Sequence, residues 1–148
     1  MKSGGILKHV VIAFVLALGV YALSFFLIEG ARVSKGPWLV EFQSDAAGVP
    51  AVIVTQTKLK IQRVRFEFPE DRISATNLLE IVAFDRPRTQ VPFGKVVFFD
   101  TTFQPGTVTL QLFGHEIEFL PRTLVLDKQE IPWKSESVYR LPRPVSNP

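Results

Sequence analysis

An uninterrupted apolar run near the N-terminus constrains this chain more than any other feature. Residues 10–28, VVIAFVLALGVYALSFFLI, are 19 amino acids without a charged side chain. As a helix they would be about 28 Å long, close to the roughly 30 Å of hydrocarbon in a bilayer. A lone segment in lipid satisfies its backbone hydrogen bonds only as a helix. The run therefore predicts a transmembrane helix over residues 10–28.

A cleaved signal peptide is the alternative interpretation of the same run. Lys2 and Lys8 would form its basic start, and residues 20–22 offer a small-residue cleavage site. Cleavage there would leave LSFFLI at the new N-terminus. The run is also longer than the roughly 7 to 15 residues of a signal-peptide core. We therefore expect an uncleaved signal-anchor.

The excess of positive charge belongs to this N-terminal segment. The chain has 17 Lys and Arg against 14 Asp and Glu, a net charge of +3. Residues 1–36 hold four basic side chains against Glu29 alone, whereas residues 37–148 hold 13 of each sign. Cations that flank an apolar run favour a membrane surface. A domain that is neutral overall argues against a nucleic-acid partner.

The flanking charges do not fix the orientation, because Lys2 and Lys8 balance Arg32 and Lys35. The N-terminal stub, residues 1–9, is too short to fold, whereas the residues after 37 have the composition of a domain. We expect the stub in the cytoplasm and the domain outside it, in the periplasm if the source is bacterial.

Several residues are candidates for contacts in or near the bilayer. Ala13 and Ala17 have the spacing of a small-residue pair that packs a partner helix, although ordinary alanines in a tolerant span are the simpler explanation. Lys2, Lys8 and Trp38 are candidates for the membrane interface. For Trp38, burial in the core is the simpler alternative.

The pattern changes after a predicted juxtamembrane linker, residues 29–37, EGARVSKGP. Short segments rich in Val, Ile, Phe and Thr follow, separated by Gly, Pro or Asp. The predicted strands cover residues 38–44, 51–57, 62–68, 95–103, 107–113, 116–120 and 123–127. They predict an all-β domain over residues 38–140, an antiparallel β-sandwich or partly open barrel. Residues 141–148 form a proline-rich extended tail.

Turn signals predict a three-strand meander in the second half. Gly114-His115 fits a two-residue type II′ loop. The pairs would be Phe113 with Glu116, Leu112 with Ile117, and Leu110 with Phe119. Pro105-Gly106 fits a type II turn. Its pairs would be Phe103 with Val108, Thr101 with Leu110, and Phe99 with Leu112. Residues 95–103 are apolar at both odd and even positions, which predicts a central strand covered on two sides.

Two segments are less regular. Between residues 58 and 68 the apolar positions change from odd to even, which predicts a bulge near Gln62. Residues 75–82 follow a helical spacing after Ser74, which predicts a short helix, with a strand over residues 78–84 as the alternative.

Six basic residues of the domain are candidates for contact with lipid or an acidic partner: Lys58, Lys60, Arg63, Arg65, Arg86 and Arg88. The bulge would bring the first four together on the outer face of the sheet. A charged edge that resists strand pairing is the simpler interpretation of that row.

Candidates for catalysis are few. The chain has no cysteine and two histidines, His9 and His115. Asp100 is an unexpected carboxylate in an apolar segment, and capping the strand end or accepting a hydrogen bond from Thr101 or Thr102 is its simplest role. None of the phosphate-loop, nucleophile-elbow, zinc or calcium motifs is present in the sequence. We expect no enzymatic activity, no cofactor and no metal.

The sequence predicts a single-pass membrane protein. By elimination, we expect an accessory or scaffolding protein whose extracytoplasmic β-sandwich binds another envelope or membrane-complex protein. Alternatives are a lipid or small-ligand carrier with a cavity in the β domain, and a secreted β-sandwich with a cleaved signal peptide. A hydrolase or metal-dependent enzyme built on Asp100, His115 and nearby glutamates is a further hypothesis.

Overall fold

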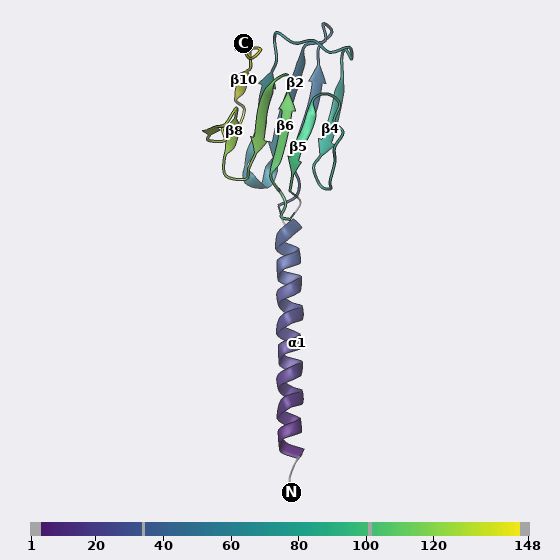
Figure 1. Cartoon of the computed structure of the whole chain (residues 1–148), viewed down its shortest axis with the longest axis vertical. Coiled ribbons are helices and arrows are strands. Elements are labelled where there is room, and N and C mark those ends of the chain that lie inside the picture. Colours follow the sequence, from purple (N-terminus) through teal and green to yellow (C-terminus); the bar gives the residue numbers. More distant parts are fainter. Residues whose placement is uncertain (1–3, 34, 101, 146–148) are drawn as a thin grey trace.

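A computed structural model describes residues 4–33, 35–100 and 102–145. One long helix, α1 (Gly4–Val33), leads into a two-layered β domain at its C-terminal end (Figure 1). The side chains of α1 are apolar on all sides, and the domain covers none of its central part. By length and composition α1 is able to cross a membrane, as an anchor or as a signal sequence.

Helix α1 is longer than the apolar run at both ends. It includes Lys8 and His9 from the predicted stub, and Glu29 and Arg32 from the predicted linker. Arg32 Nη1 lies 3.1 Å from Glu29 Oε2, one turn earlier, an ion pair that supports the last helical turns. The connection to the domain is therefore short, residues 34–37, of which Ser34 lies outside the described residues.

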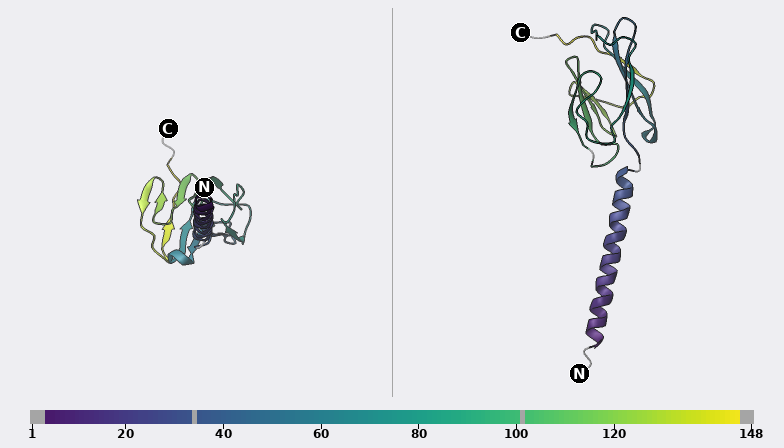
Figure 2. Two further views of the ribbon diagram at one scale, coloured as in Figure 1. Left: turned by 90° about the horizontal axis from the view of Figure 1, so that it is seen from below. Right: turned by 90° about the vertical axis from the view of Figure 1, so that its right-hand side faces the viewer.

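The predicted β-sandwich is confirmed, as two five-stranded sheets without a closed barrel (Figure 2). The first sheet has the order β10-β3-β2-β1-β4: β1 (Leu39–Ser44), β2 (Pro50–Gln56), β3 (Ile61–Glu67), β4 (Leu79–Ala83) and β10 (Val138–Arg140). The second has the order β5-β6-β7-β8-β9: β5 (Lys95–Phe99), β6 (Val108–Leu112), β7 (His115–Phe119), β8 (Leu124–Leu126) and β9 (Gln129–Ile131). Strand β10 pairs parallel with β3, and the other pairs are antiparallel.

The core lies between the sheets and is rich in aromatic rings. Alternate residues of each strand point inward, as the period of two requires. The largest fully buried side chains include Trp38, Phe42, Phe66, Phe68, Phe84 and Phe119. Ring contacts join the two layers, for example Phe66 with Phe119 at 6.5 Å. These rings fill the space between the sheets.

The predicted bulge near Gln62 is confirmed. Strand β2 pairs with β3 at Val54 and Val64, and then at Gln56 and Ile61, so β3 has one extra residue at positions 62–63. Arg63 has a φ of 46° at this point. The preceding turn is a 3₁₀ helix, η1 (Thr57–Leu59).

The predicted short helix after Ser74 is wrong, and the alternative strand is confirmed as β4. Residues 79–83 pair with β1, where Ile81 lies opposite Glu41. The Ser44 hydroxyl holds the approach to β4, because it donates to the Ala75 carbonyl and accepts from the Leu78 amide. Pairing with β1 overrides the local helical spacing.

The turn between β6 and β7 lies one residue earlier than predicted. Phe113 and Gly114 occupy it with φ of 50° and 89°, a type I′ rather than a type II′ loop. Leu112 therefore pairs with His115, and Leu110 with Ile117. The predicted pairs shift by two residues, so the same side chains still face the core. The loop moves because Phe113 packs on Phe68 and Phe93, while His115 is buried within β7.

Pro105-Gly106 does not form the predicted tight turn. The Asp100 amide donates to the Thr107 carbonyl at 2.9 Å, and Phe99 pairs with Val108, so a longer loop, residues 100–107, joins β5 to β6. Thr101, predicted opposite Leu110, lies outside the described residues. The loop is held open by the helix, because the Arg32 side chain donates to the Thr102 carbonyl at 2.7 Å.

Strand β5 was predicted to be central and is instead an edge strand. It begins the order of its sheet, and within the described residues it pairs with β6 alone. Val97 and Phe98 are exposed, whereas Val96 and Phe99 pack against the core. The apolar residues at odd and even positions of β5 therefore do not indicate two buried faces: one face of the strand is buried and the other is exposed to solvent.

The first residues of the predicted tail are fastened to the domain. Leu141 is buried, and the Pro142 carbonyl oxygen lies 2.8 Å from His115 Nε2. Arg143 pairs with Asp71, with Nη2 2.8 Å from Oδ1. This contact raises the pKa of Arg143.

Candidate functional site

The structure distributes the predicted basic row over η1 and β3. Lys58 lies in η1, Lys60 caps its C-terminal end, and Arg63 lies in the bulge, all exposed to solvent. Arg65 lies further along β3 on the outer face of the first sheet. Arg63 and Arg65 line one shallow pocket on the outer face of this sheet, together with Ile53, Glu136 and Val138.

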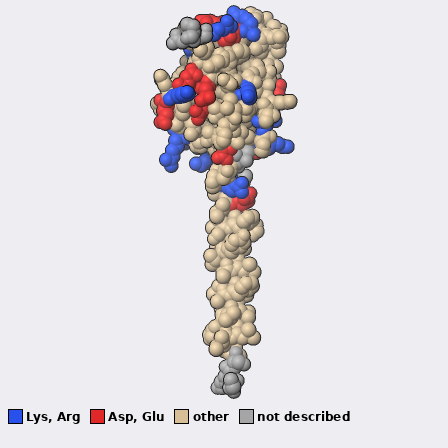
Figure 3. All heavy atoms as spheres, viewed as in Figure 1, with Lys and Arg blue, Asp and Glu red and all other residues tan. Residues whose placement is uncertain are grey.

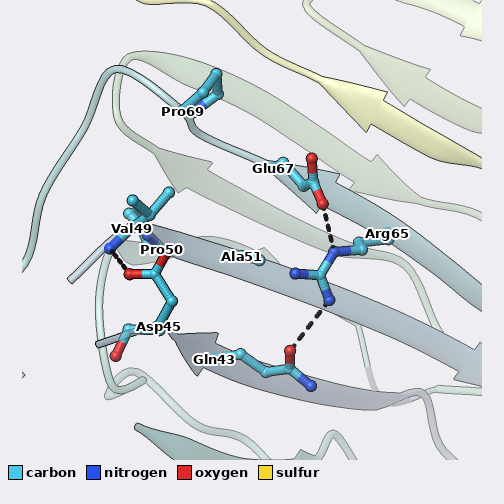
Figure 4. Close-up of a pocket in the computed structure, with 9 residues that line it drawn as sticks. Gln43, Asp45, Val49, Pro50, Ala51, Arg65, Glu67 and Pro69 are labelled. Carbon is cyan, nitrogen blue, oxygen red and sulfur yellow. Dashed lines mark hydrogen bonds and ion pairs between the residues drawn. The ribbon is translucent and has the colours of Figure 1, made fainter. Parts of the chain in front are cut away.

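Arg65 is part of a hydrogen-bonded network in a shallow pocket of about 330 Å³ (Figure 4). Its Nε donates to Glu67 Oε1 at 2.7 Å, and its Nη1 donates to Gln43 Oε1 at 3.1 Å. Gln43 in turn donates to Glu41, and Arg140 Nε donates to Glu67 Oε2 at 3.2 Å. The network links β1, β3 and β10 across the sheet. Two of the five N–H groups of Arg65 are engaged in this way, so the side chain is held against the sheet.

The network predicts a pH dependence of stability centred on Glu67. The hydrogen bond from Arg65, with a further one from Arg140, lowers the pKa of Glu67 below its ordinary 4.5. A carboxylate with a lowered folded-state pKa contributes stability above its unfolded-state pKa and loses it as the pH falls through the folded value. Glu67→Gln should therefore be less stable than the parent near pH 7, and the difference should shrink below about pH 4.5.

Urea unfolding at a series of pH values checks this expectation. Arg65→Gln removes the largest cause of the lowered pKa and should weaken the same pH dependence. Stability curves for the parent and E67Q that remain parallel into acid would contradict the proposed role of Glu67.

Arg86 and Arg88 lie in the loop between β4 and β5. Arg86 is exposed, and its Nε is 3.6 Å from Asp85 Oδ1. Arg88 is half-buried and lines a shallow groove beside β5. Gln104 Nε2 donates to the Asp85 carbonyl at 2.8 Å, which places this loop next to residues 100–107.

Trp38 is completely buried, so its ring does not reach the lipid interface. The indole Nε1 donates to the Gly106 carbonyl at 2.6 Å. The ring centroid is 5.3 Å from that of Trp133 and 5.8 Å from that of Phe119. The core alternative for Trp38 is confirmed.

The predicted residues of the helix are only partly described. Lys8, Ala13 and Ala17 lie exposed on α1, with the two alanines one turn apart. Lys2 lies outside the described residues.

Asp100 and His115 do not form a common site. Asp100 follows β5 next to the helix, whereas His115 begins β7 at the opposite end of β6. The Asp100 carboxylate accepts a hydrogen bond from the Thr102 amide at 2.8 Å, so the predicted hydrogen bond with Thr102 is present. Hydrogen bonding by Thr102 lowers the pKa of Asp100. Within residues 4–33, 35–100 and 102–145, no group of three or more His, Asp or Glu side chains is placed to hold a metal ion.

His115 has a structural environment. Its Nδ1 lies 2.6 Å from Asp127 Oδ2, and its Nε2 faces the Pro142 carbonyl. Asp127 Oδ1 also accepts from the Glu116 amide at 2.9 Å. The buried imidazole thus links β7, the β8–β9 turn and the tail.

Four large exposed apolar residues lie on the two edge strands at one side of the sandwich. Strand β4 ends the first sheet and β5 begins the second, and residues 84–94 connect them (Figure 1). Leu79 and Ile81 on β4 are 68% and 64% exposed, and Val97 and Phe98 on β5 are 50% and 54% exposed. We call these four residues the open apolar edge. Along each strand, one backbone edge has no partner strand within the described part of the chain.

Sequence reasoning missed this surface for a physical reason. An apolar residue at every position indicates contact on both faces of a strand, but not whether the second contact lies within the chain or with another molecule. Long apolar edge strands are also templates for strand pairing, which soluble proteins normally block with charges. Exposed apolar surface is a feature of association sites, so the open apolar edge is a candidate site.

Comparisons with known proteins give no relative on which to base a function: no protein-family model matches the sequence, and no curated protein or solved structure matches it either.

Proposed function

We propose that this chain is a single-pass, membrane-anchored accessory or scaffolding protein. Helix α1 holds the β-sandwich at the bilayer, and the open apolar edge binds another protein of the same membrane complex. The observation that carries the proposal is the exposure of Leu79, Ile81, Val97 and Phe98 on two unpaired edge strands.

The chemistry of the edge favours a protein partner. An added strand would satisfy the free backbone groups of β4 or β5, and its side chains would cover the apolar residues beside them. Burial of apolar surface contributes roughly 25 cal/mol per Å², so covering these side chains is a substantial driving force. Edge strands β4 and β5 each present two large exposed apolar residues beside one exposed charge, Glu80 or Lys95. Strand β10 presents one such apolar residue, Val138, and β9 presents none.

The position of the domain supports a partner in the same membrane. Residues 34–37 are a short connection, and the Gln104 amide donates to the Arg32 carbonyl at 2.6 Å. An anchored helix would therefore hold the open apolar edge close to the bilayer. We infer that residues 1–9 lie in the cytoplasm and the domain outside it.

A carrier function has less support. The space that a lipid or small ligand would occupy between the sheets holds the rings of Phe42, Phe66 and Phe119. The groove beside Val97 and Phe98 opens to solvent on the outside of β5.

Site-specific photocrosslinking in native membranes tests the proposal. A crosslinker at Phe98 or Ile81 should join the chain to one partner protein in a defined ratio, and the pair should copurify in mild detergent. Ile81→Glu and Phe98→Glu should each reduce copurification at least about tenfold, because a charge would be buried in the interface.

Val138→Glu is the matched control. Val138 is also an exposed apolar residue on an edge strand of the first sheet, but on the opposite side. Equal loss for V138E, crosslinks only between copies of this chain, or a partner-free monodisperse protein in native lipid would contradict the proposal. Recovery of a soluble polypeptide that lacks its apolar run would show a cleaved signal peptide instead.

A further inference from the structure

The end of the β domain that faces the helix is formed by loops that contact each other. The Gln104 amide donates to the Arg32 carbonyl, and the Gln104 side chain donates to the Asp85 carbonyl. Gln56 Nε2 donates to the Pro37 carbonyl at 2.9 Å, which joins η1 to the connection. We call these loops the helix-proximal end: residues 35–37, 57–60, 85–90, 100–107, 120–123 and 132–136.

The last two loops belong to the same end. Trp133 packs against Trp38, and its Nε1 donates to the Leu120 carbonyl at 2.8 Å. Ser135 Oγ donates to the Lys60 carbonyl at 2.9 Å. Contacts between side chains and backbone thus place all six loops around the end of α1.

Charge is segregated along the domain although the domain is nearly neutral overall. The helix-proximal end carries seven basic residues: Lys35, Lys58, Lys60, Arg86, Arg88, Arg122 and Lys134. It has three acidic residues, Asp85, Asp100 and Glu136, whereas the remainder of residues 37–148 has seven basic and ten acidic residues. Figure 3 shows Lys and Arg atoms around the lower rim of the domain, with most visible Asp and Glu atoms higher up.

These cations are available to an external partner. Six of the seven are exposed, and Arg88 is half-buried. Among the ion pairs of the described residues, only the one between Arg86 and Asp85 involves this group. The group therefore differs from Arg65, which forms an ion pair with Glu67.

In a bilayer crossed by α1, the length of the helix would put this end at the level of the lipid headgroups. The apolar run ends at Ile28, and the helix continues to Val33. Five further residues add about 7 Å, close to the depth of the polar layer on one side of a bilayer. The six loops lie at this end of α1, and six of their seven basic side chains are exposed.

We propose that the helix-proximal end binds the anionic headgroups of the bilayer that α1 crosses. The inference rests on the membrane anchoring of the proposed function and assigns a lipid contact to a surface separate from the open apolar edge. Each Lys or Arg near an anionic membrane surface contributes about fivefold to the ratio of docked to undocked domain. Docking fixes the tilt of the domain and so the height at which the open apolar edge meets its partner.

Reconstitution of the full chain into vesicles tests the proposal. The chain has no cysteine, so Thr57→Cys introduces a single site for a fluorophore at the helix-proximal end. Lipids with nitroxide-labelled headgroups should quench this fluorophore strongly in phosphatidylcholine vesicles that contain phosphatidylglycerol. Quenching should fall in pure phosphatidylcholine and in about 1 M salt, where the Debye length is about 3 Å.

Two matched triple variants distinguish the effect of the basic residues at the helix-proximal end from the effect of the net charge of the domain. K58Q/K60Q/K134Q removes three cations of the helix-proximal end and should lower the docked-to-undocked ratio on the order of 100-fold. R72Q/K95Q/K128Q removes three cations outside that end and should leave quenching unchanged. Lys60 and Lys128 both have positive φ, 60° and 69°, so the two triples carry comparable backbone strain.

The outcomes distinguish this proposal from the proposed function. A chain that carbonate extracts from the vesicles is not anchored, and both proposals then fail. Stable insertion with equal quenching in neutral and anionic vesicles, or with equal effects of the two triples, overturns the lipid contact alone.

Discussion

Replacement of Trp38 by alanine is expected to lower the free energy of unfolding of the β domain by about 4 kcal/mol. Trp38 is the first residue after the connection from α1, and none of its side chain is exposed. Its loss leaves a large cavity beside Trp133 and Phe119, and removal of a buried Trp typically costs about 3 to 5 kcal/mol.

A second cost arises at the junction with the helix. The Trp38 indole donates to the Gly106 carbonyl at 2.6 Å, and that loop also binds Arg32. A buried carbonyl that loses its donor costs about 1 to 3 kcal/mol. The variant should therefore loosen the loop over residues 100–107 in addition to the core.

Urea unfolding of the full chain in detergent, followed by circular dichroism in the strand region, measures the change. Trp38→Phe is the control, because it keeps most of the ring volume but removes the donor to Gly106, and it should cost less than W38A. A cost below about 1 kcal/mol for W38A would show that the ring is not an essential part of the core.

The helix and the sandwich were predictable because they depend on short-range patterns. Nineteen uncharged residues identify a membrane-spanning segment by length alone. The change of parity around Gln62 located the bulge, because one extra residue reverses which side chains face the core. Such patterns are local, and the structure preserves them.

Pairing partners were less predictable because they depend on contacts distant in sequence. Ile81 lies in a strand rather than a helix because it pairs with Glu41 of β1, which is 40 residues earlier in the sequence. Strand β5 lies at an edge, but its apolar composition is the same as that of a central strand. The sequence of a strand does not indicate whether another strand of the same chain pairs with its second edge.

The basic surface was predicted only in part, for a related reason: Lys58, Lys60, Arg86 and Arg88 were candidates from the sequence, whereas Arg122 and Lys134 were not. The basic residues at 58, 60, 86, 88, 122 and 134 are scattered along the sequence, and only the fold gathers them around α1. Arg65 was included in the basic row on the basis of spacing, but Glu67 and Gln43 engage its donors. Side-chain pairing across strands is what decides which cations remain free.

Replacement of Gly106 by alanine is expected to disrupt the loop between β5 and β6. A Cβ at this position would overlap the Asp100 carbonyl oxygen and lie 3.0 Å from the Phe103 carbonyl oxygen. Both obstacles are backbone atoms, so no side-chain rotation relieves the clash. The loop would have to open, with an expected cost of about 3 kcal/mol or more.

The same opening should detach the helix from the domain, because Gly106 accepts from Trp38 and the adjacent Gln104 amide donates to Arg32. Gly36→Ala separates this clash from simple backbone strain. Gly36 has a φ of 74° but open space around it, so its replacement should cost only about 1 kcal/mol.

Urea unfolding measures both variants, and amide hydrogen exchange of residues 100–107 locates the change. G106A should raise exchange throughout the loop, whereas G36A should leave it near the parent rate. Equal stability losses for the two variants, with no added exchange in the loop, would show that Gly106 does not close the junction.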